Sequence, residues 1–277
     1  MMTTNKPGLA YALGNTDAEH ERLIRQAIHL APCTERFFRA AGIGPSQRVL
    51  DLGSGVGDVV MLAARLVGPS GEVVGIEHDA RSIARARARI SEARLHNVSF
   101  IQSEISSFTS DKQFDAVIGR FILQFLPAAA ATLRWVSQLV RPAGIMAFQE
   151  PSWAPFLLLS SHLPLWSACA ALTHEALQRS GGDTEMGLAL YRIFQEAGLP
   201  APHLIMEIPL GRDPDSARWI YDLFCTLLPH IRRLNLSLDK LGDMDTLFER
   251  IQAEASAANG VVPWMAVVGA WSTVQAR

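Results

Sequence analysis

Short apolar runs alternate with amphipathic helical patterns through the first half of the chain. The runs are rich in Val, Ile, Leu and Phe and are bounded by polar residues or glycine, which is typical of buried parallel strands. They cover residues 49–52, 73–76, 98–102, 114–119 and 145–148. Between them, helical patterns occupy residues 59–67, 80–93 and 128–140. Strands that alternate with helices predict parallel crossovers and a doubly wound α/β sheet.

Helices are also expected on both sides of this region. A capping box at residues 16–19 opens a helix that runs to about Leu30, and Pro32 begins a second helix that ends at Gly42. After the fifth strand, a helix is predicted over residues 185–197 and a sixth strand over 204–210. Residues 213–258 are largely helical by period and are interpreted as an insertion before a last strand over 263–274.

The turn after the first strand, within residues 48–57, carries glycine at every second position. Gly53, Gly55 and Gly57 keep Cβ atoms away, so the backbone can approach a ligand while the next helix points its first N–H groups into the same space. A dinucleotide fingerprint would need its third glycine at position 58, which is Asp58. The G-x-G-x-G spacing therefore makes NAD the weaker interpretation.

Polar side chains stand at the carboxyl ends of the predicted strands, where open α/β sheets bind ligands. Glu77 ends the second strand, and a carboxylate there can accept both hydroxyls of a ribose. Glu104 follows the third strand and could accept an exocyclic amine, while Ile105 could pack on a base. These residues predict an adenosine-type ligand.

The order and spacing of these motifs resemble those of class I S-adenosylmethionine-dependent methyltransferases of the bacterial small-molecule type, over roughly residues 48–151. The matching segments are VLDLGSGVG, VVGIEHD, FIQSEI, FDAVIGRFILQFLP and LVRPAGIMAFQEP. The resemblance implies a Rossmann-like, seven-stranded, mostly parallel sheet with an N-terminal helical cap and helical lid insertions. It also implies S-adenosyl-L-methionine as the cofactor. Glu104 departs from the family, which more often has Asp at that position.

The resemblance further implies which residues hold the cofactor. Asp51 and the backbone near Gly53 would hold the methionine part, Glu77 the ribose, and Glu104 with Ile105 the adenine. The leader YALGNTDAEHER also resembles the first segment of bacterial small-molecule members. The expected cofactor-binding residues are Tyr11, Asp51, Gly53, Ser54, Gly55, Gly57, Glu77, His78, Glu104, Ile105 and Arg120.

Composition limits the partners. The 277 residues are 49% hydrophobic, which suits one elaborated domain or a domain with a small cap. The net charge of −2 gives no electrostatic reason to bind nucleic acid. The one basic run, with Arg81, Arg85 and Arg89 on one helix face, is interpreted as a solvated surface. Three cysteines without C-x-x-C spacing favour neither disulfides nor a metal site, and an N-terminus without an apolar signal core favours a cytoplasmic location.

Residues 151–174 contain no charged side chain and are long enough to cross a bilayer. Interrupting prolines and serines argue against a span, although a membrane-surface role stays open. The segment is interpreted as a lid over the cofactor site, with an apolar acceptor chamber made by Trp153, Phe156, Leu157 to Leu159, Leu163 and Trp166. The expected substrate-pocket residues are Gln124, Glu150, Trp153, His162 and Trp166.

Four segments follow from these patterns. They are an N-terminal helical cap (1–44), a cofactor-binding Rossmann-like core (45–150), an apolar lid with its return helix (151–200), and the last two strands with a helical insertion (201–277).

The leading hypothesis is in-line methyl transfer to a small apolar or aromatic metabolite, in a protein that aligns the reactants and excludes water. A phenol or alcohol acceptor would need a base, for which His20, Glu150, His162 and His174 are candidates, His20 and Glu150 foremost. A cyclase or rearrangement enzyme on the same fold and a non-catalytic sensor of the cofactor remain open alternatives. A homodimer is a possible further partner. The sequence does not choose between O-, N- and C-methylation.

Overall fold

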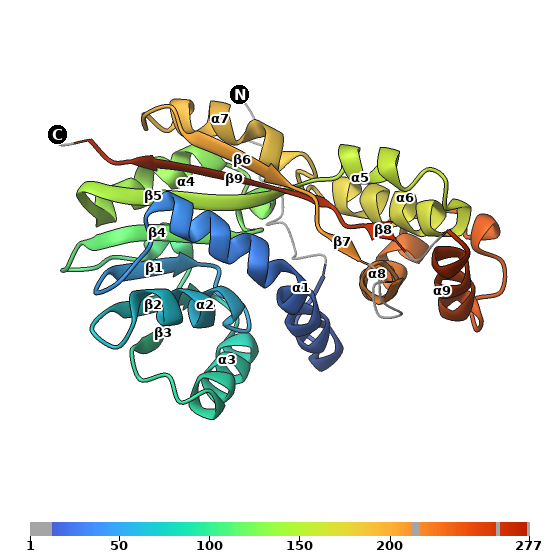
Figure 1. The fold of residues 1–277 in the computed structure, drawn as a ribbon, viewed down its shortest axis with the longest axis horizontal. Helices are drawn as coiled ribbons and strands as arrows, with labels where there is room; N and C mark the ends of the chain where they lie inside the picture. The colour runs from blue at the N-terminus through green and yellow to red at the C-terminus, as the bar shows by residue number, and fades with distance from the viewer. Residues whose placement is uncertain (1–12, 212–216, 259–260, 276–277) are drawn as a thin grey trace, which may run out of the picture.

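The computed structural model describes residues 13–211, 217–258 and 261–275. Figure 1 shows two joined parts, with a twisted sheet and its helices on the left and a group of helices on the right. One expected cofactor residue, Tyr11, lies outside the described residues.

The sheet has seven strands in the order β3-β2-β1-β4-β5-β9-β6. The order of the strands along the chain reverses between the neighbouring strands β1 and β4. Strand β9 is antiparallel to β5 and β6, and the other strand pairs of this sheet are parallel. The strands are β1 (Arg48–Leu52), β2 (Glu72–Glu77), β3 (Val98–Gln102), β4 (Phe114–Arg120), β5 (Val140–Ser152), β6 (His203–Glu207) and β9 (Ala266–Thr273). The expected mostly parallel, doubly wound sheet is confirmed.

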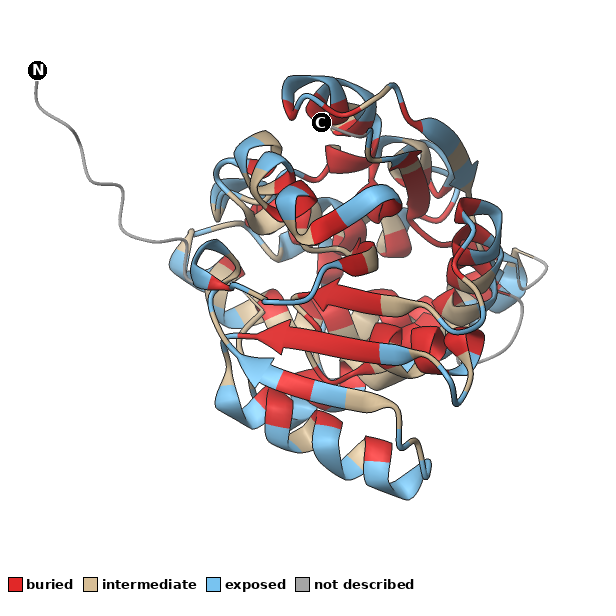
Figure 2. Cartoon of the chain, turned by 90° about the vertical axis from the view of Figure 1, so that its left-hand side faces the viewer, coloured by how far each residue is buried: buried red, intermediate tan, exposed pale blue. Residues whose placement is uncertain are grey.

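Helices cover both faces of the sheet, because its central strands are apolar on both sides. Val49 of β1 packs with α1, α2 and α3 on one face, whereas Leu50 and Leu52 pack with α4 and α7 on the other. Figure 2 shows the central strands as buried along most of their length. These helices are α1 (Asp17–Ala41), α2 (Asp58–Val67), α3 (Ala80–Glu92), α4 (Ala129–Val136) and α7 (Met186–Glu196), with short 3-10 turns η1 (Ile105–Ser107), η2 (Leu123–Phe125) and η3 (Ser137–Leu139).

The N-terminal cap is one helix, which corrects the expectation of two. The hydroxyl of Thr16 accepts the N–H of Glu19 at the start of α1, and Gly42 ends the helix in a left-handed conformation, as predicted. Pro32 lies inside α1 and removes one backbone donor without ending the helix. The reason is tertiary packing, because Phe37 is fully buried against β9, where a Cβ on Gly269 would lie 2.4 Å from the ring.

The expected solvated face of α3 is confirmed for Arg81 and Arg85, whose side chains are 62% and 38% exposed, and all three arginines also pair with acidic groups. Arg81 pairs with Asp17 at 3.0 Å and Arg85 pairs with Glu21 at 2.6 Å, both across to α1. Arg89 pairs with Asp58 at 2.7 Å, and its side chain is only 14% exposed. These ion pairs therefore connect α3 to α1 and α2.

The helical part joins the segment after β5 to the insertion before β9. It contains α5 (Ala154–Leu159), α6 (Pro164–Arg179), α8 (Arg218–Arg233), η5 (Asp239–Leu241) and α9 (Leu247–Ala257), beside a two-stranded ribbon of β7 (Leu210–Gly211) and β8 (Val262–Pro263). The predicted helical insertion is confirmed over the described residues. The strand expected over 204–210 is divided into β6 and β7.

Aromatic side chains form the core of this helical part. The rings of Trp219 and Trp264 stack with centroids 4.9 Å apart, and Trp166 meets Trp219 edge-on. Phe156 and Leu163 are buried in the same cluster. The lid aromatics are thus mainly core residues that pack on α8. Within the described residues, no helix is long and apolar enough to cross a membrane.

Candidate functional site

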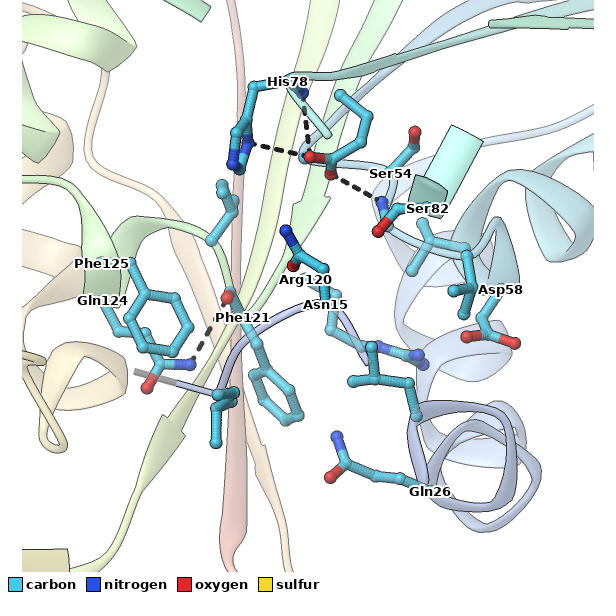
Figure 3. A pocket seen from close by; sticks show the side chains of 18 of the residues that line it. Asn15, Gln26, Ser54, Asp58, His78, Ser82, Arg120, Phe121, Gln124 and Phe125 are labelled. Carbon is cyan, nitrogen blue, oxygen red and sulfur yellow. Dashed lines mark hydrogen bonds and ion pairs between the residues drawn. The ribbon is translucent and has the colours of Figure 1, made fainter. Parts of the chain in front are cut away.

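A cavity of about 570 Å³ lies at the carboxyl ends of β1, β2 and β4, between the sheet edge and α1 (Figure 3). Most of the expected cofactor residues line it: Gly53, Ser54, Gly55, Glu77, His78, Glu104, Ile105 and Arg120. His20, Gln124 and Trp153 line it as well. The sheet edge therefore brings together side chains that are far apart in the sequence.

The three glycines of the turn after β1 have different functions. All three have positive φ, with values of 64° at Gly53, 50° at Gly55 and 87° at Gly57. Gly55 lines the cavity, and a Cβ there would enter open space. A Cβ on Gly53 would lie 2.5 Å from the side chain of Ile122. Gly57 does not line the cavity, and its missing side chain instead lets α2 approach Ala86 of α3.

Glu77 ties the glycine turn to the end of β2. Its Oε2 accepts the N–H of Gly55 at 3.0 Å, and its Oε1 accepts the N–H groups of His78 and Asp79 at 2.9 Å each. The ring Nδ1 of His78 lies 2.8 Å from the same Oε1. Because a carboxylate has about four acceptor positions, Oε2 keeps the capacity to accept a ligand hydroxyl.

Two buried polar groups at this edge lack partners. Asp51 is 1% exposed, and neither its Oδ2 nor the Ser54 hydroxyl has a hydrogen-bond partner in the part of the chain that is described. Burial raises the pKa of Asp51 well above its usual range, although Arg120 opposes the rise. A buried carboxyl with an unused oxygen would be satisfied by a cationic ligand group such as an ammonium.

Arg120 supplies the opposite charge. Its guanidinium donates to the Thr34 hydroxyl at 3.1 Å, and that hydroxyl donates to Gln149 at 2.7 Å. Burial lowers the pKa of Arg120, while Asp58 and Asp51 act in the opposite direction. No carboxylate of the described residues lies within ion-pair distance of this guanidinium. The cavity can therefore take a ligand that carries both an ammonium and a carboxylate.

Glu150 holds the turn after β4 and does not line the cavity, which corrects the expectation that it faces the pocket. Its carboxylate accepts the N–H groups of Ile122, Leu123 and Gln124 at 3.0, 2.8 and 3.3 Å. Phe121, at the start of that turn, has a left-handed φ of 57°. Burial raises the pKa of Glu150 to about 8, although the three N–H groups act to lower it.

Other expected site residues lie elsewhere. Trp166 is in the core of the helical part, and His162 is exposed in the turn before α6. His174 is hydrogen-bonded to Thr184 at 2.9 Å. These three residues do not line the cavity. Asp51 does not line it either, although Gly53, Ser54 and Gly55, which follow it closely in the chain, do.

Beyond His20, sequence reasoning missed the residues that α1 supplies to the wall of the cavity. Arg22, Leu23 and Gln26 line the cavity from α1, and Figure 3 shows Gln26 on the opposite side of the Phe121 ring from Gln124. The helical spacing of Arg22 and Gln26 could have indicated a polar stripe. Apolar residues on several other elements complete the wall: Phe121, Ile122, Phe125, Leu126, Leu177, Leu223 and Met265.

Comparison with known proteins gives a consistent result. Residues 43–198 match a family described as a methyltransferase domain. An arsenite methyltransferase of Halobacterium salinarum is 32% identical over 118 residues, which cover 42% of this chain and 30% of the relative. The ubiquinone/menaquinone biosynthesis C-methyltransferase UbiE of Pseudomonas paraeruginosa is 32% identical over 117 residues, which cover 40% of this chain and 46% of the relative.

The solved structure of YjhP from E. coli superimposes with a TM-score of 0.55 at 17% identity, covering 96% of this chain and 100% of that one. This similarity shows the fold. The chain spans between 30% and 46% of the length of the two curated relatives. The comparisons leave the expected cytoplasmic location and the possible homodimer as predictions.

The raised pKa of Glu150 predicts how stability depends on pH. The folded state holds this proton more strongly than the unfolded state, whose carboxyl has its ordinary pKa of 4.5. The resulting stabilisation is full below that value and is lost as the pH rises through about 8. Urea unfolding at about pH 5 and about pH 9 should show a loss on the order of a few kcal/mol in the wild type.

In Glu150→Gln this loss should be much smaller, because the residue no longer titrates. Glu196→Gln is the matched control, since Glu196 is exposed at the end of α7. An equal pH dependence in the wild type and Glu150→Gln would show that Glu150 is already ionised at neutral pH.

Proposed function

The chain belongs to the methyltransferase-domain family as a class I S-adenosylmethionine-dependent member, and from this premise we propose that the protein transfers a methyl group to a small apolar or aromatic metabolite. The observation that carries the proposal is that one cavity is lined both by charged groups at the sheet edge and by apolar side chains from several elements. Glu77 and Arg120 are among the charged groups, and Phe121, Phe125 and Leu223 are among the apolar ones; we assign them to a polar end and an apolar end.

The polar end suits the cofactor. S-adenosylmethionine supplies a methyl group on a positively charged sulfur, which is already a good leaving group. In the proposed arrangement, Oε2 of Glu77 accepts a ribose hydroxyl, and Glu104 with Ile105 holds the adenine. Arg120 takes the carboxylate of the amino-acid tail, and Asp51 takes its ammonium. Two facts about the described residues support this assignment: Oδ2 of Asp51 has no hydrogen-bond partner, and the Arg120 guanidinium has no carboxylate partner.

The apolar end suits the methyl acceptor. Phe121, which a left-handed backbone holds in place, and Phe125 lie beside aliphatic side chains from α6, α8 and the segment before β9. Such a wall excludes water and aligns a planar or aliphatic molecule with the reacting methyl group. Trp153 is the lid aromatic that lines this end.

His20 is our candidate for the base that an acidic acceptor would need. It is 4% exposed and lines the cavity, unlike Glu150, His162 and His174. Its Nε2 lies 3.2 Å from the Ser82 hydroxyl, whose own proton is donated to Asp79 at 2.9 Å. Neutral His20 must therefore carry its proton on Nε2, which leaves Nδ1 as the nitrogen that can accept a proton.

Replacing Arg120 should weaken binding of the amino-acid tail alone. In Arg120→Met, the Kd of S-adenosylhomocysteine should rise at least about 10-fold, since hydrogen bonds to a charged group contribute about 1.5–3 kcal/mol. The Kd of 5′-methylthioadenosine should stay within about 2-fold, because this compound keeps the nucleoside and thioether but lacks the tail. Isothermal titration calorimetry measures both values.

Arg48→Met is the matched control, because Arg48 pairs with Glu72 at the opposite end of the sheet strands. It should leave both Kd values unchanged. An equal loss of affinity for both ligands in Arg120→Met, or no loss for either, would show that Arg120 does not bind the amino-acid tail.

The reaction itself is tested with S-adenosylmethionine carrying a labelled methyl group, incubated with a panel of phenols, quinols and aromatic amines. We expect the labelled methyl group in the product of one acceptor class, together with a stoichiometric amount of S-adenosylhomocysteine. An unlabelled product of unchanged mass would support a cyclase or rearrangement enzyme instead. Cofactor binding without turnover for the whole panel and for cell extracts would support a sensor.

The assignment of His20 predicts a selective defect. In His20→Gln, which can still donate to Ser82 but has no basic nitrogen, kcat for a phenolic acceptor should fall about 100-fold or more. With an acceptor that loses no proton, such as a tertiary amine, kcat should change less than about 2-fold. An equal loss for both acceptors would point to a positional effect rather than proton transfer.

A further inference from the structure

The wall of the cavity on α1 contains a buried polar stripe. Glu19, Arg22 and Gln26 are spaced so that they share one helix face, and all three are at least nine-tenths buried. The Arg22 guanidinium donates to both carboxylate oxygens of Glu19 at 2.7 Å each. Thr226 of α8 donates to the same carboxylate at 3.2 Å. The stripe therefore carries two charges that compensate each other.

This pair fixes the orientation of the Gln26 amide. Arg22 Nη1 donates to Gln26 Oε1 at 2.6 Å, so the carbonyl end of the amide faces Arg22 and the NH₂ end faces away. Gln26 lines the cavity, and its NH₂ group has no hydrogen-bond partner among residues 13–211, 217–258 and 261–275. Figure 3 shows the Gln26 side chain reaching into the cavity toward the Phe121 ring.

Burying a charged pair beside an apolar chamber is costly, and such pairs are often no better for stability than apolar residues of the same shape. A rigidly held Gln26 amide, fixed as a hydrogen-bond donor, would give this costly pair a function. A donor that is fixed before the ligand binds loses little conformational entropy on binding.

We propose that Gln26 determines specificity by donating to a neutral oxygen, a carbonyl or a hydroxyl, on an otherwise apolar methyl acceptor. This inference rests on the proposed function, because it names the substrate class of the same cavity. The compensated charge of Arg22 favours a neutral oxygen over a carboxylate. Gln124 lies on the other side of the Phe121 ring, where its NH₂ donates to the Phe121 carbonyl at 3.4 Å.

The test uses two probes of the same shape, acetophenone and α-methylstyrene, which differ in having a carbonyl oxygen or a CH₂ group at one position. Their Kd values are measured by ligand-observed NMR on the full chain saturated with S-adenosylhomocysteine. In Gln26→Met, which keeps the length of the side chain but has no donor, acetophenone should lose affinity relative to α-methylstyrene by about 3- to 10-fold.

Leu23→Met is the matched control, since Leu23 lines the same cavity one turn away on α1. It should leave the ratio of the two Kd values unchanged. The affinity of both variants for S-adenosylhomocysteine should equal that of the wild type, which shows that fold and cofactor site are intact.

A ratio that is the same in the wild type and Gln26→Met would overturn the inference, and so would the absence of binding by either probe to the loaded wild type. Both results leave the proposed function standing if S-adenosylhomocysteine binds. Failure of the wild type to bind S-adenosylhomocysteine at all would instead remove the proposed function.

Discussion

Carboxylates that collect backbone N–H groups hold the turns on which the rest of this site depends. Glu77 gathers three such groups at the ends of β1 and β2, and Glu150 gathers three in the turn after β4. The same device recurs in the helical part, where Glu185 accepts two N–H groups at the start of α5 and Glu254 accepts two at the start of α6. Each turn would otherwise expose unpaired donors.

The site gives up stability in two places that a ligand can restore. Among the described residues, Oδ2 of the buried Asp51 has no hydrogen-bond partner, and the partly buried Arg120 guanidinium has no carboxylate partner. Unsatisfied groups of this kind cost about 1–3 kcal/mol each, so they persist where binding needs them. The buried Glu19–Arg22 pair on α1 also costs stability through the desolvation of two charges, although each charge compensates the other.

Local signals predicted the cofactor half of the fold well. The strand expected over 98–102 is β3, and Gly55 and Glu77 line one cavity, because parallel strands deliver their ends to one edge. Features that depend on tertiary contacts could not be predicted. Pro32 lies inside one continuous helix because tertiary packing holds that helix together. Glu150 accepts backbone N–H groups of the turn after β4, and no local sequence signal predicts these hydrogen bonds. The aromatic residues of the predicted lid pack against residues of the insertion, which lie far along the chain.

We propose that one cavity binds a nucleoside with a charged amino-acid tail at the sheet edge and leaves an apolar chamber beside it. A crystal structure of the protein with S-adenosylhomocysteine is the decisive experiment. We expect the ribose at Glu77, the tail carboxylate at Arg120 and the ammonium at Asp51, with the thioether facing the chamber that Phe121 and Gln26 line. A ligand bound elsewhere, or a tail that leaves Asp51 and Arg120 without partners, would contradict it.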